Sequence, residues 1–169
     1  MANFNMDQLN NLFKNATYSS KGKKNVKTYW NIAMMYDIET SSFMYNEQKC
    51  AIPYSHAAGI MDINTNEQFI YVYRTNEEIM QFFDLLVAKS KEYGNHLLPI
   101  YIHNAAYDLG FMGSYFNFNE IFANGDIRKI LYARTNDIEF RCSYMLSDKS
   151  LREIAKTTES DKLYYDYGS

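Results

Sequence analysis

Asp37 and Glu39 are two carboxylates that stand one residue apart, directly after the apolar run WNIAMMY of residues 30–36. In an extended strand, residues i and i+2 point to the same face, so both side chains are expected to project together from the end of a buried strand. Carboxylate oxygens arranged in this way suit a hard divalent cation such as Mg²⁺ or Mn²⁺. An Asp-x-Glu pair alone is a weak signal, because an ordinary solvated strand end has the same sequence.

A second group of polar residues follows another apolar run, LLPIYI of residues 97–102. His103 and Asn104 come directly after this run, and Asp108 follows four residues later. If a helix begins near this point, Asn104 and Asp108 share one of its faces. Tyr107 offers a ring on which a nucleobase can stack. Three acids at the ends of two buried strands predict a metal site, and two such ions support in-line attack on a phosphodiester.

The elements that must position these residues can be predicted from periodicity and caps. Apolar strands are expected at residues 30–39, 56–63, 67–74 and 96–104. One hairpin is expected between 56–63 and 67–74, and a second between 127–134 and 138–145. The strongest helix covers residues 75–94, where Thr75 and Glu78 form a capping box and Gly94 ends the helix. Further helices are expected at residues 6–13, 105–116 and 147–158. This order predicts an α/β domain with a central mixed sheet flanked by helices.

Composition limits the functional classes. The chain of 169 residues has the length of one domain, and 47% hydrophobic residues supply an ample core. A formal net charge of -3 argues against a protein that coats nucleic acid indiscriminately, although a local basic patch can still exist. Residues 15–27, with Gly22 among four lysines, are expected to form a mobile basic loop. With two cysteines and no apolar stretch of membrane-spanning or signal-peptide length, a cytoplasmic location is expected.

The motifs DIET and HNAAYDLGF together resemble the first and second exonuclease motifs of a known family. It is the DnaQ-like 3′-5′ exonuclease (proofreading) domain of protein-primed family B DNA polymerases from phages and linear plasmids. FRCSYMLSDKSLREIAK (residues 140–156) resembles the single-strand-binding segment of that family, and KLYYDY (residues 162–167) resembles its Lys-containing segment. The resemblance covers residues 30–169 and implies a ribonuclease H-like fold. Residues 1–29, a helix and the basic loop, lie outside it.

The resemblance implies roles for particular residues. Asp37, Glu39 and Asp108 would be catalytic residues and ligands of two Mg²⁺ or Mn²⁺ ions. The residues implied in DNA binding are Thr40, Asn104, Tyr107, Ser143, Tyr144 and Lys162. Four of these have structural alternatives: satisfying a strand-end amide (Thr40), capping the following helix (Asn104), packing in the core (Tyr107) and a solvated charge (Lys162). The implied partners are a single-stranded DNA 3′ end, the remaining polymerase domains and a terminal protein, and a phage-encoded chain would act in the host cytoplasm.

The sequence also departs from the family pattern. Cys142 stands where an Asp is common, and the third motif, Tyr-x-x-x-Asp, does not follow KLYYDY before the sequence ends at Ser169. Residues 144–148 have this spacing, but they overlap the single-strand-binding segment. We therefore expect a domain apparently truncated at its C-terminus, and two functions remain open. One is a metal-dependent exonuclease, and the other is a catalytically weak module that binds single-stranded DNA or a protein partner.

Overall fold

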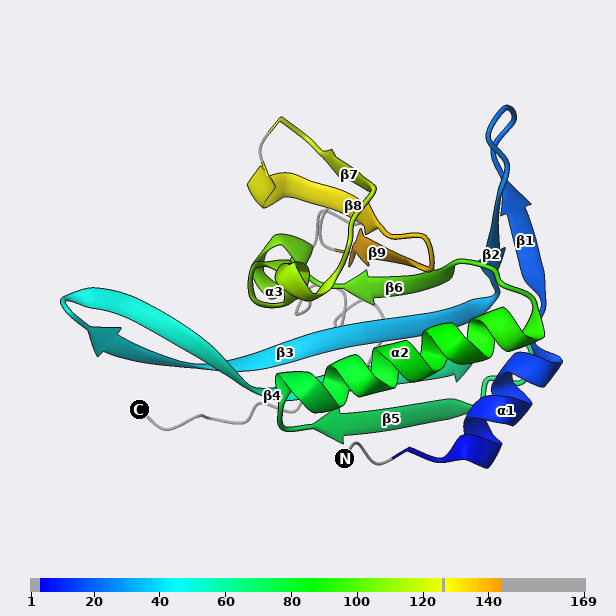
Figure 1. Ribbon diagram of the computed structural model, residues 1–169, viewed down its shortest axis with the longest axis horizontal. Coiled ribbons are helices and arrows are strands. Elements are labelled where there is room, and N and C mark those ends of the chain that lie inside the picture. Colours follow the sequence, from blue (N-terminus) through cyan, green and yellow to red (C-terminus); the bar gives the residue numbers. More distant parts are fainter. Residues whose placement is uncertain (1–3, 126, 144–169) are drawn as a thin grey trace, which may run out of the picture.

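The alternating apolar segments of the sequence build a seven-stranded mixed sheet with three α-helices (Figure 1). The computed structural model describes residues 4–125 and 127–143. The elements in chain order are α1 (Met6–Asn15), β1 (Tyr18–Lys21), β2 (Lys27–Trp30), β3 (Ile32–Tyr45), β4 (Gln48–Asp62), β5 (Gln68–Tyr73), α2 (Asn76–Tyr93), β6 (Leu98–Ile102), α3 (Ala105–Met112), η1 (Gly113–Tyr115), β7 (Glu120–Ala123), η2 (Ile127–Lys129), β8 (Ile130–Arg134) and β9 (Ile138–Cys142). The predicted α/β class with a mixed sheet is confirmed. The helix expected at residues 147–158 lies outside the described residues.

The seven strands lie in the order β5-β4-β3-β6-β9-β8-β7. Strands β3, β4 and β5 form an antiparallel meander, β6 is parallel to β3, and β9 is parallel to β6. The two hairpins predicted from the sequence are present as β4–β5 and β8–β9. Parallel neighbours need a crossover connection, and α2 and α3 lie in the two connections that lead to β6 and β9. The carboxyl ends of β6 and β9 therefore meet at one edge of the sheet.

The helix α2 begins and ends where its sequence predicts. The Thr75 hydroxyl oxygen accepts the backbone N–H of Glu78 at 3.2 Å, and Gly94 is the C-cap residue. Four apolar side chains of α2 are buried against the sheet: Ile79, Phe82, Phe83 and Leu86. The helix α1 contributes Leu9, Leu12 and Phe13 to the same hydrophobic core. Among the described residues, no helix is long and apolar enough to cross a membrane.

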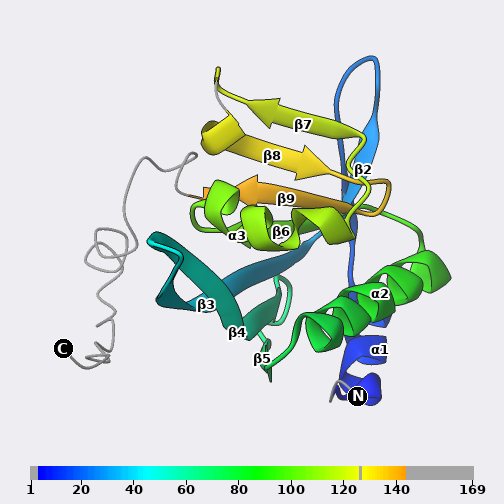
Figure 2. The ribbon, with the colours of Figure 1, turned by 60° about the vertical axis from the view of Figure 1, so that its left-hand side comes forward.

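The three α-helices lie on one face of the sheet (Figure 2). The Phe83 ring of α2 packs edge-on against Tyr36 of β3 and Phe140 of β9. The backbone N–H of Ala105, at the start of α3, lies 3.4 Å from the Cys142 sulfur of β9. On the opposite face, Met35 is 54% exposed and Ile70 is 76% exposed. In the described part of the chain, this second face is not covered by a helix.

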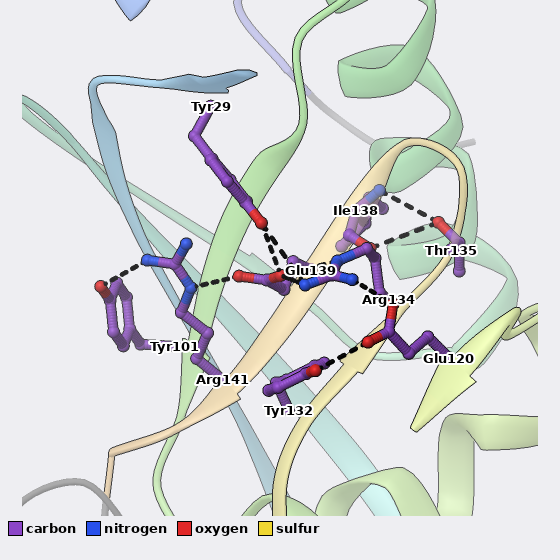
Figure 3. A network of polar contacts seen from close by, with 9 residues as sticks. All are labelled: Tyr29, Tyr101, Glu120, Tyr132, Arg134, Thr135, Ile138, Glu139 and Arg141. Carbon is purple, nitrogen blue, oxygen red and sulfur yellow. Dashed lines mark hydrogen bonds and ion pairs between the residues drawn. The ribbon is translucent and has the colours of Figure 1, made fainter. Parts of the chain in front are cut away.

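An ionic cluster on the second face joins β2 to β6, β8 and β9 (Figure 3). Glu139 is 4% exposed, and its carboxylate accepts hydrogen bonds from Tyr29 Oη at 2.9 Å, Arg134 Nε at 2.7 Å and Arg141 Nε at 2.6 Å. Arg134 also pairs with Glu120 of β7. The residues that make up this Glu139 network are Tyr29, Tyr101, Glu120, Tyr132, Arg134, Glu139 and Arg141. The network fixes β2 against strands that are far away in the sequence.

The prediction of a basic loop over residues 15–27 is wrong for residues 18–21 and 27, which lie in strands, whereas residues 22–26 do form a loop. Strands β1 and β2 form a separate two-stranded antiparallel ribbon, with Tyr18 opposite Trp30 and Lys21 opposite Lys27. Gly22, at φ +106, allows the chain to leave β1 in a conformation that other residues rarely adopt. The strand β1 buries none of its side chains, so its polar sequence carries no alternating apolar signal. Backbone pairing with β2 is what orders it.

Candidate functional site

The two acids of DIET lie within a long strand and not at its end. Strand β3 continues to Tyr45, because β4 pairs with it along its whole length, from Ile32 opposite Asp62 to Tyr45 opposite Gln48. The neighbour on the other side, β6, pairs with β3 only from Met34 to Tyr36. The predicted strand end is therefore wrong for β3 itself. The acids instead follow the point at which its parallel neighbour stops.

The side chains of Asp37 and Glu39 do share a face, as strand alternation predicts. Both are exposed, whereas Tyr36 and Ile38, which alternate with them, are buried. Beyond the end of β6, the edge of β3 no longer has a strand beside it in the described part of the sheet. This open edge leaves room for a side chain from another element to approach the two acids.

Asp108 of α3 is the side chain that approaches this edge. It is 3% exposed, and its carboxylate is hydrogen-bonded by the backbone N–H of Ile38, the residue between the two acids. The pKa of Asp108 is raised to about 7, first by burial, then by the negative charge of Asp37 and, to a smaller extent, by that of Glu39; the hydrogen bond from Ile38 partly offsets this increase. The second oxygen, Oδ2, is buried without a hydrogen-bond partner. Asp108 therefore lies within electrostatic reach of Asp37 and Glu39.

Thr40, which follows Glu39, and Tyr107, which precedes Asp108, also connect β3 with α3. Their hydroxyl oxygens are 2.7 Å apart and hydrogen-bonded. The Tyr107 side chain is 45% exposed, so the alternative in which it packs in the core is wrong. Thr40 bonds to another side chain rather than capping a strand-end amide. Each member of this pair is adjacent in sequence to an acid, and their bond holds β3 against α3 beside those acids.

Asn104 has a different position from the one predicted. It precedes α3 in the left-handed region, at φ 60° and ψ 61°, and its side chain makes no capping hydrogen bond. Asn104 is exposed whereas Asp108 is buried, so the two do not share a helix face. Asn tolerates this conformation better than most residues because its short polar side chain bonds locally. The amide of Asn104 is therefore exposed at the start of α3.

The carboxyl ends of β6 and β9 bring two further residues together. His103 Nδ1 lies 3.1 Å from the hydroxyl oxygen of Ser143, which was one of the predicted DNA-binding residues. The sequence does not indicate that His103 has this neighbour, because the two are 40 positions apart. Tyr144 and Lys162, the other predicted DNA-binding residues of the C-terminal segment, lie outside the described residues.

Beneath the acids lies a buried polar chain that the sequence did not reveal. Tyr36 Oη and His56 Nδ1 are 2.7 Å apart, and His56 Nε2 lies 2.9 Å from Asn76 Oδ1. Because an amide oxygen can only accept, Nε2 of His56 donates to it and Nδ1 accepts the Tyr36 hydroxyl hydrogen. Burial lowers the pKa of His56, which keeps the ring neutral. Burial raises the pKa of Tyr36, and the charges of Asp108 and Asp37 add to the increase.

The carboxylates meet part of the requirement for a divalent cation. Mg²⁺ and Mn²⁺ prefer oxygen ligands. The Oδ2 atom of Asp108 is buried without a hydrogen-bond partner, and it is an oxygen that could coordinate such an ion. Within residues 4–125 and 127–143, however, no three side chains of His, Cys, Asp or Glu form a group able to hold a metal. The residues that would hold an ion are Asp108 and Asp37, with Glu39 beside them.

Comparisons of the chain with protein-family models, curated proteins and solved structures found no match. The function is therefore inferred from the residues of the chain and their arrangement.

Proposed function

We propose that the chain is a ribonuclease H-like (DnaQ-like) 3′-5′ exonuclease domain that acts on single-stranded DNA 3′ ends, as in a protein-primed family B DNA polymerase. One observation carries the proposal: Asp108 is buried at the edge of β3, and its pKa is raised to about 7, mainly by burial and then by the charge of Asp37, with a smaller increase from Glu39. A titratable group whose pKa is strongly shifted by burial and by a charged neighbour is typical of functional sites. The antiparallel meander β3–β4–β5, followed by the parallel strands β6 and β9, is also compatible with this class of sheet.

In this proposal, different residues of the chain bind the metal ion and the DNA. Asp37 and Asp108, with Glu39 beside them, would bind Mg²⁺ or Mn²⁺, and the bound ion supplies an activated water and stabilises the leaving oxygen. Tyr107 presents an exposed ring on which the terminal base can stack, and its hydrogen bond to Thr40 fixes the orientation of that ring. The Asn104 amide would bind the nucleotide. Positioning of the scissile phosphodiester by these groups supplies part of the rate.

The second candidate function, a binding module with weak catalysis, is favoured by a specific observation. No third acid joins Asp37 and Asp108 in a metal-holding group among the described residues. A two-ion site that lacks a ligand loses rate more than affinity, because DNA binding depends on other contacts. We therefore expect this chain to bind single-stranded DNA and to digest it slowly.

We expect Mn²⁺ to stabilise the fold, because an ion that binds only the native state raises its stability. For a dissociation constant one tenth of the Mn²⁺ concentration, the gain is about 1.4 kcal/mol, which raises the melting temperature by about 3 to 6 °C for a chain of this size. Thermal melts with and without 5 mM Mn²⁺ measure this, with Asp37→Asn as the variant and Asp84→Asn, an exposed acid of α2, as the matched control. A response that survives in Asp37→Asn would place the ion elsewhere.

The exonuclease proposal itself is tested by timed digestion of a 5′-labelled single-stranded oligonucleotide with Mg²⁺ or Mn²⁺. We expect slow, stepwise shortening from the 3′ end, and a rate lower by about tenfold or more in Asp37→Ala/Glu39→Ala. The control is Asp84→Ala, which leaves the site unchanged. Digestion that continues equally fast in the double variant would exclude these acids as the catalytic residues, and no digestion by any variant would favour the binding module.

A further inference from the structure

One segment of this acidic chain contains basic residues and no acids. Between Asp7 and Asp37 the sequence contains five lysines and no Asp or Glu, although the whole chain has 20 acids and 17 basic residues. Four of these lysines lie in the β1–β2 ribbon (residues 18–30): Lys21, Lys23, Lys24 and Lys27. A cluster of one sign of charge in a chain of the opposite net sign creates a local field that attracts a polyanion.

The ribbon stands clear of the main sheet and carries these lysines toward its tip (Figures 1 and 2). Lys21 lies directly opposite Lys27 in the ladder, an arrangement in which like charges repel. Two local contacts offset part of this repulsion, because Lys21 lies over the ring of Tyr29 at 5.9 Å and Lys27 lies within electrostatic reach of Glu120. Lys23 and Lys24, in the loop at the tip of the ribbon, are exposed.

The root of the ribbon is held against the rest of the domain by side-chain contacts from both strands. Trp30 Nε1 donates to Ser90 Oγ of α2 at 2.8 Å, and Tyr29 Oη donates to Glu139 of β9 at 2.9 Å. The Tyr18 ring stacks on the ring of His96, with centroids 3.9 Å apart. These contacts tie both strands of the ribbon to the body of the domain. A cationic element that is held in this way loses little entropy when it binds.

We propose that the β1–β2 ribbon is a DNA-binding element that contacts the phosphate backbone without regard to sequence. Lysine is depleted at protein–protein interfaces, whereas its ammonium group is a common partner of phosphate. The choice of DNA as the polyanion rests on the proposed function. The strand β3 follows the ribbon directly, and Asp37 lies five residues along it, about 17 Å from its start. The ribbon would therefore contact a part of the DNA strand that is distant from its 3′ end, and the carboxylates would receive the 3′ end itself.

The test is binding of a labelled 30-nucleotide single strand in EDTA, which prevents digestion, at salt concentrations from 50 to 200 mM. Each lost phosphate contact reduces the slope of log K against log salt by about 0.7, so Lys23→Gln/Lys24→Gln should reduce it by about 1.4 and weaken binding several-fold at 50 mM. Lys89→Gln/Lys129→Gln removes the same charge from other elements and should leave the slope unchanged. Equal melting temperatures establish that each variant is folded.

An unchanged slope in Lys23→Gln/Lys24→Gln would overturn the proposal. Competition with polyglutamate of matched charge addresses the other kind of partner: we expect it to displace DNA at least tenfold less well than unlabelled DNA does. Equal or better displacement would assign the ribbon to an acidic protein surface and would also overturn the proposal. The outcome is separate from that of the digestion assay, because a chain can digest DNA without using the ribbon, or bind through the ribbon without digesting.

Discussion

Asp108→Asn is expected to make the protein more stable at pH 8, although the substitution removes a central group of the proposed site. The pKa of Asp108 is raised to about 7 in the folded chain, mainly by burial and then by the charge of Asp37. In the unfolded chain the carboxyl titrates near its ordinary value of about 3.9. The native state therefore keeps a proton that the unfolded state releases, and folding at high pH carries a penalty.

The direction with pH follows from the raised pKa. The contribution of Asp108 to the free energy of unfolding is fully favourable below about pH 4. It is lost as the pH rises toward 7, and it stays lost above pH 7. An uncharged Asn of the same shape avoids this loss and can still accept the Ile38 hydrogen bond. We expect a gain in unfolding free energy of about 1.5 kcal/mol at pH 5 and up to about 4 kcal/mol at pH 8.

Urea denaturation of the wild type and Asp108→Asn at pH 5 and pH 8, without divalent ions, measures the difference. Asp84→Asn, in which an exposed carboxylate of α2 is changed in the same way, is the matched control and should stay within about 0.5 kcal/mol of the wild type. Loss of stability in Asp108→Asn at pH 8 would mean that the ionised carboxylate is held by a structural partner, and would remove the main support for the proposed site. A residue that costs stability in its native form is typical of a group kept for function.

The sequence predicted those parts of the fold in which side-chain burial and periodicity agree. The helix α2 combines a capping residue, an apolar face and a terminal glycine, so its limits follow from local chemistry at Thr75 and Gly94. The shared face of Asp37 and Glu39 follows from alternation alone, because a strand of any length has a period of two. These features need no knowledge of distant contacts.

The parts that the sequence did not predict are those ordered by backbone pairing or by distant neighbours. Residues 40–45 of β3 are exposed or half-buried, and they stay extended because β4 pairs with them, although no apolar alternation marks them as a strand. Strand β1 is ordered in the same way by β2. The burial of Asp108 depends on where β6 ends, which periodicity does not specify to the residue. For the same reason, the hydrogen bond between Thr40 and Tyr107 was not foreseen.

Glu139→Gln is expected to be strongly destabilising, because Glu139 is the acceptor at the centre of the Glu139 network (Figure 3). Its carboxylate is 4% exposed and lies between two arginines. Removing one partner of a buried ion pair leaves an uncompensated buried charge, which costs about 3 to 5 kcal/mol. Burial raises the pKa of Glu139, but hydrogen bonds from Arg141 and Arg134 outweigh this and leave the pKa below its usual value.

A pKa lowered by folding means that the contribution of Glu139 is present above the ordinary glutamate pKa of about 4.3 and is lost as the pH falls through the lower folded value. The difference in unfolding free energy between the wild type and Glu139→Gln should therefore have its largest value at pH 7 and should decrease only in strong acid. Urea denaturation at pH 7 and pH 3 measures it. Glu92→Gln breaks the pair between the largely buried Lys89 side chain and the exposed Glu92, whose N–O distance is 3.0 Å, and should cost less than about 1 kcal/mol. If both variants lost equally little, the network would be no more than a surface ion pair, and β2 and the ribbon would need another anchor.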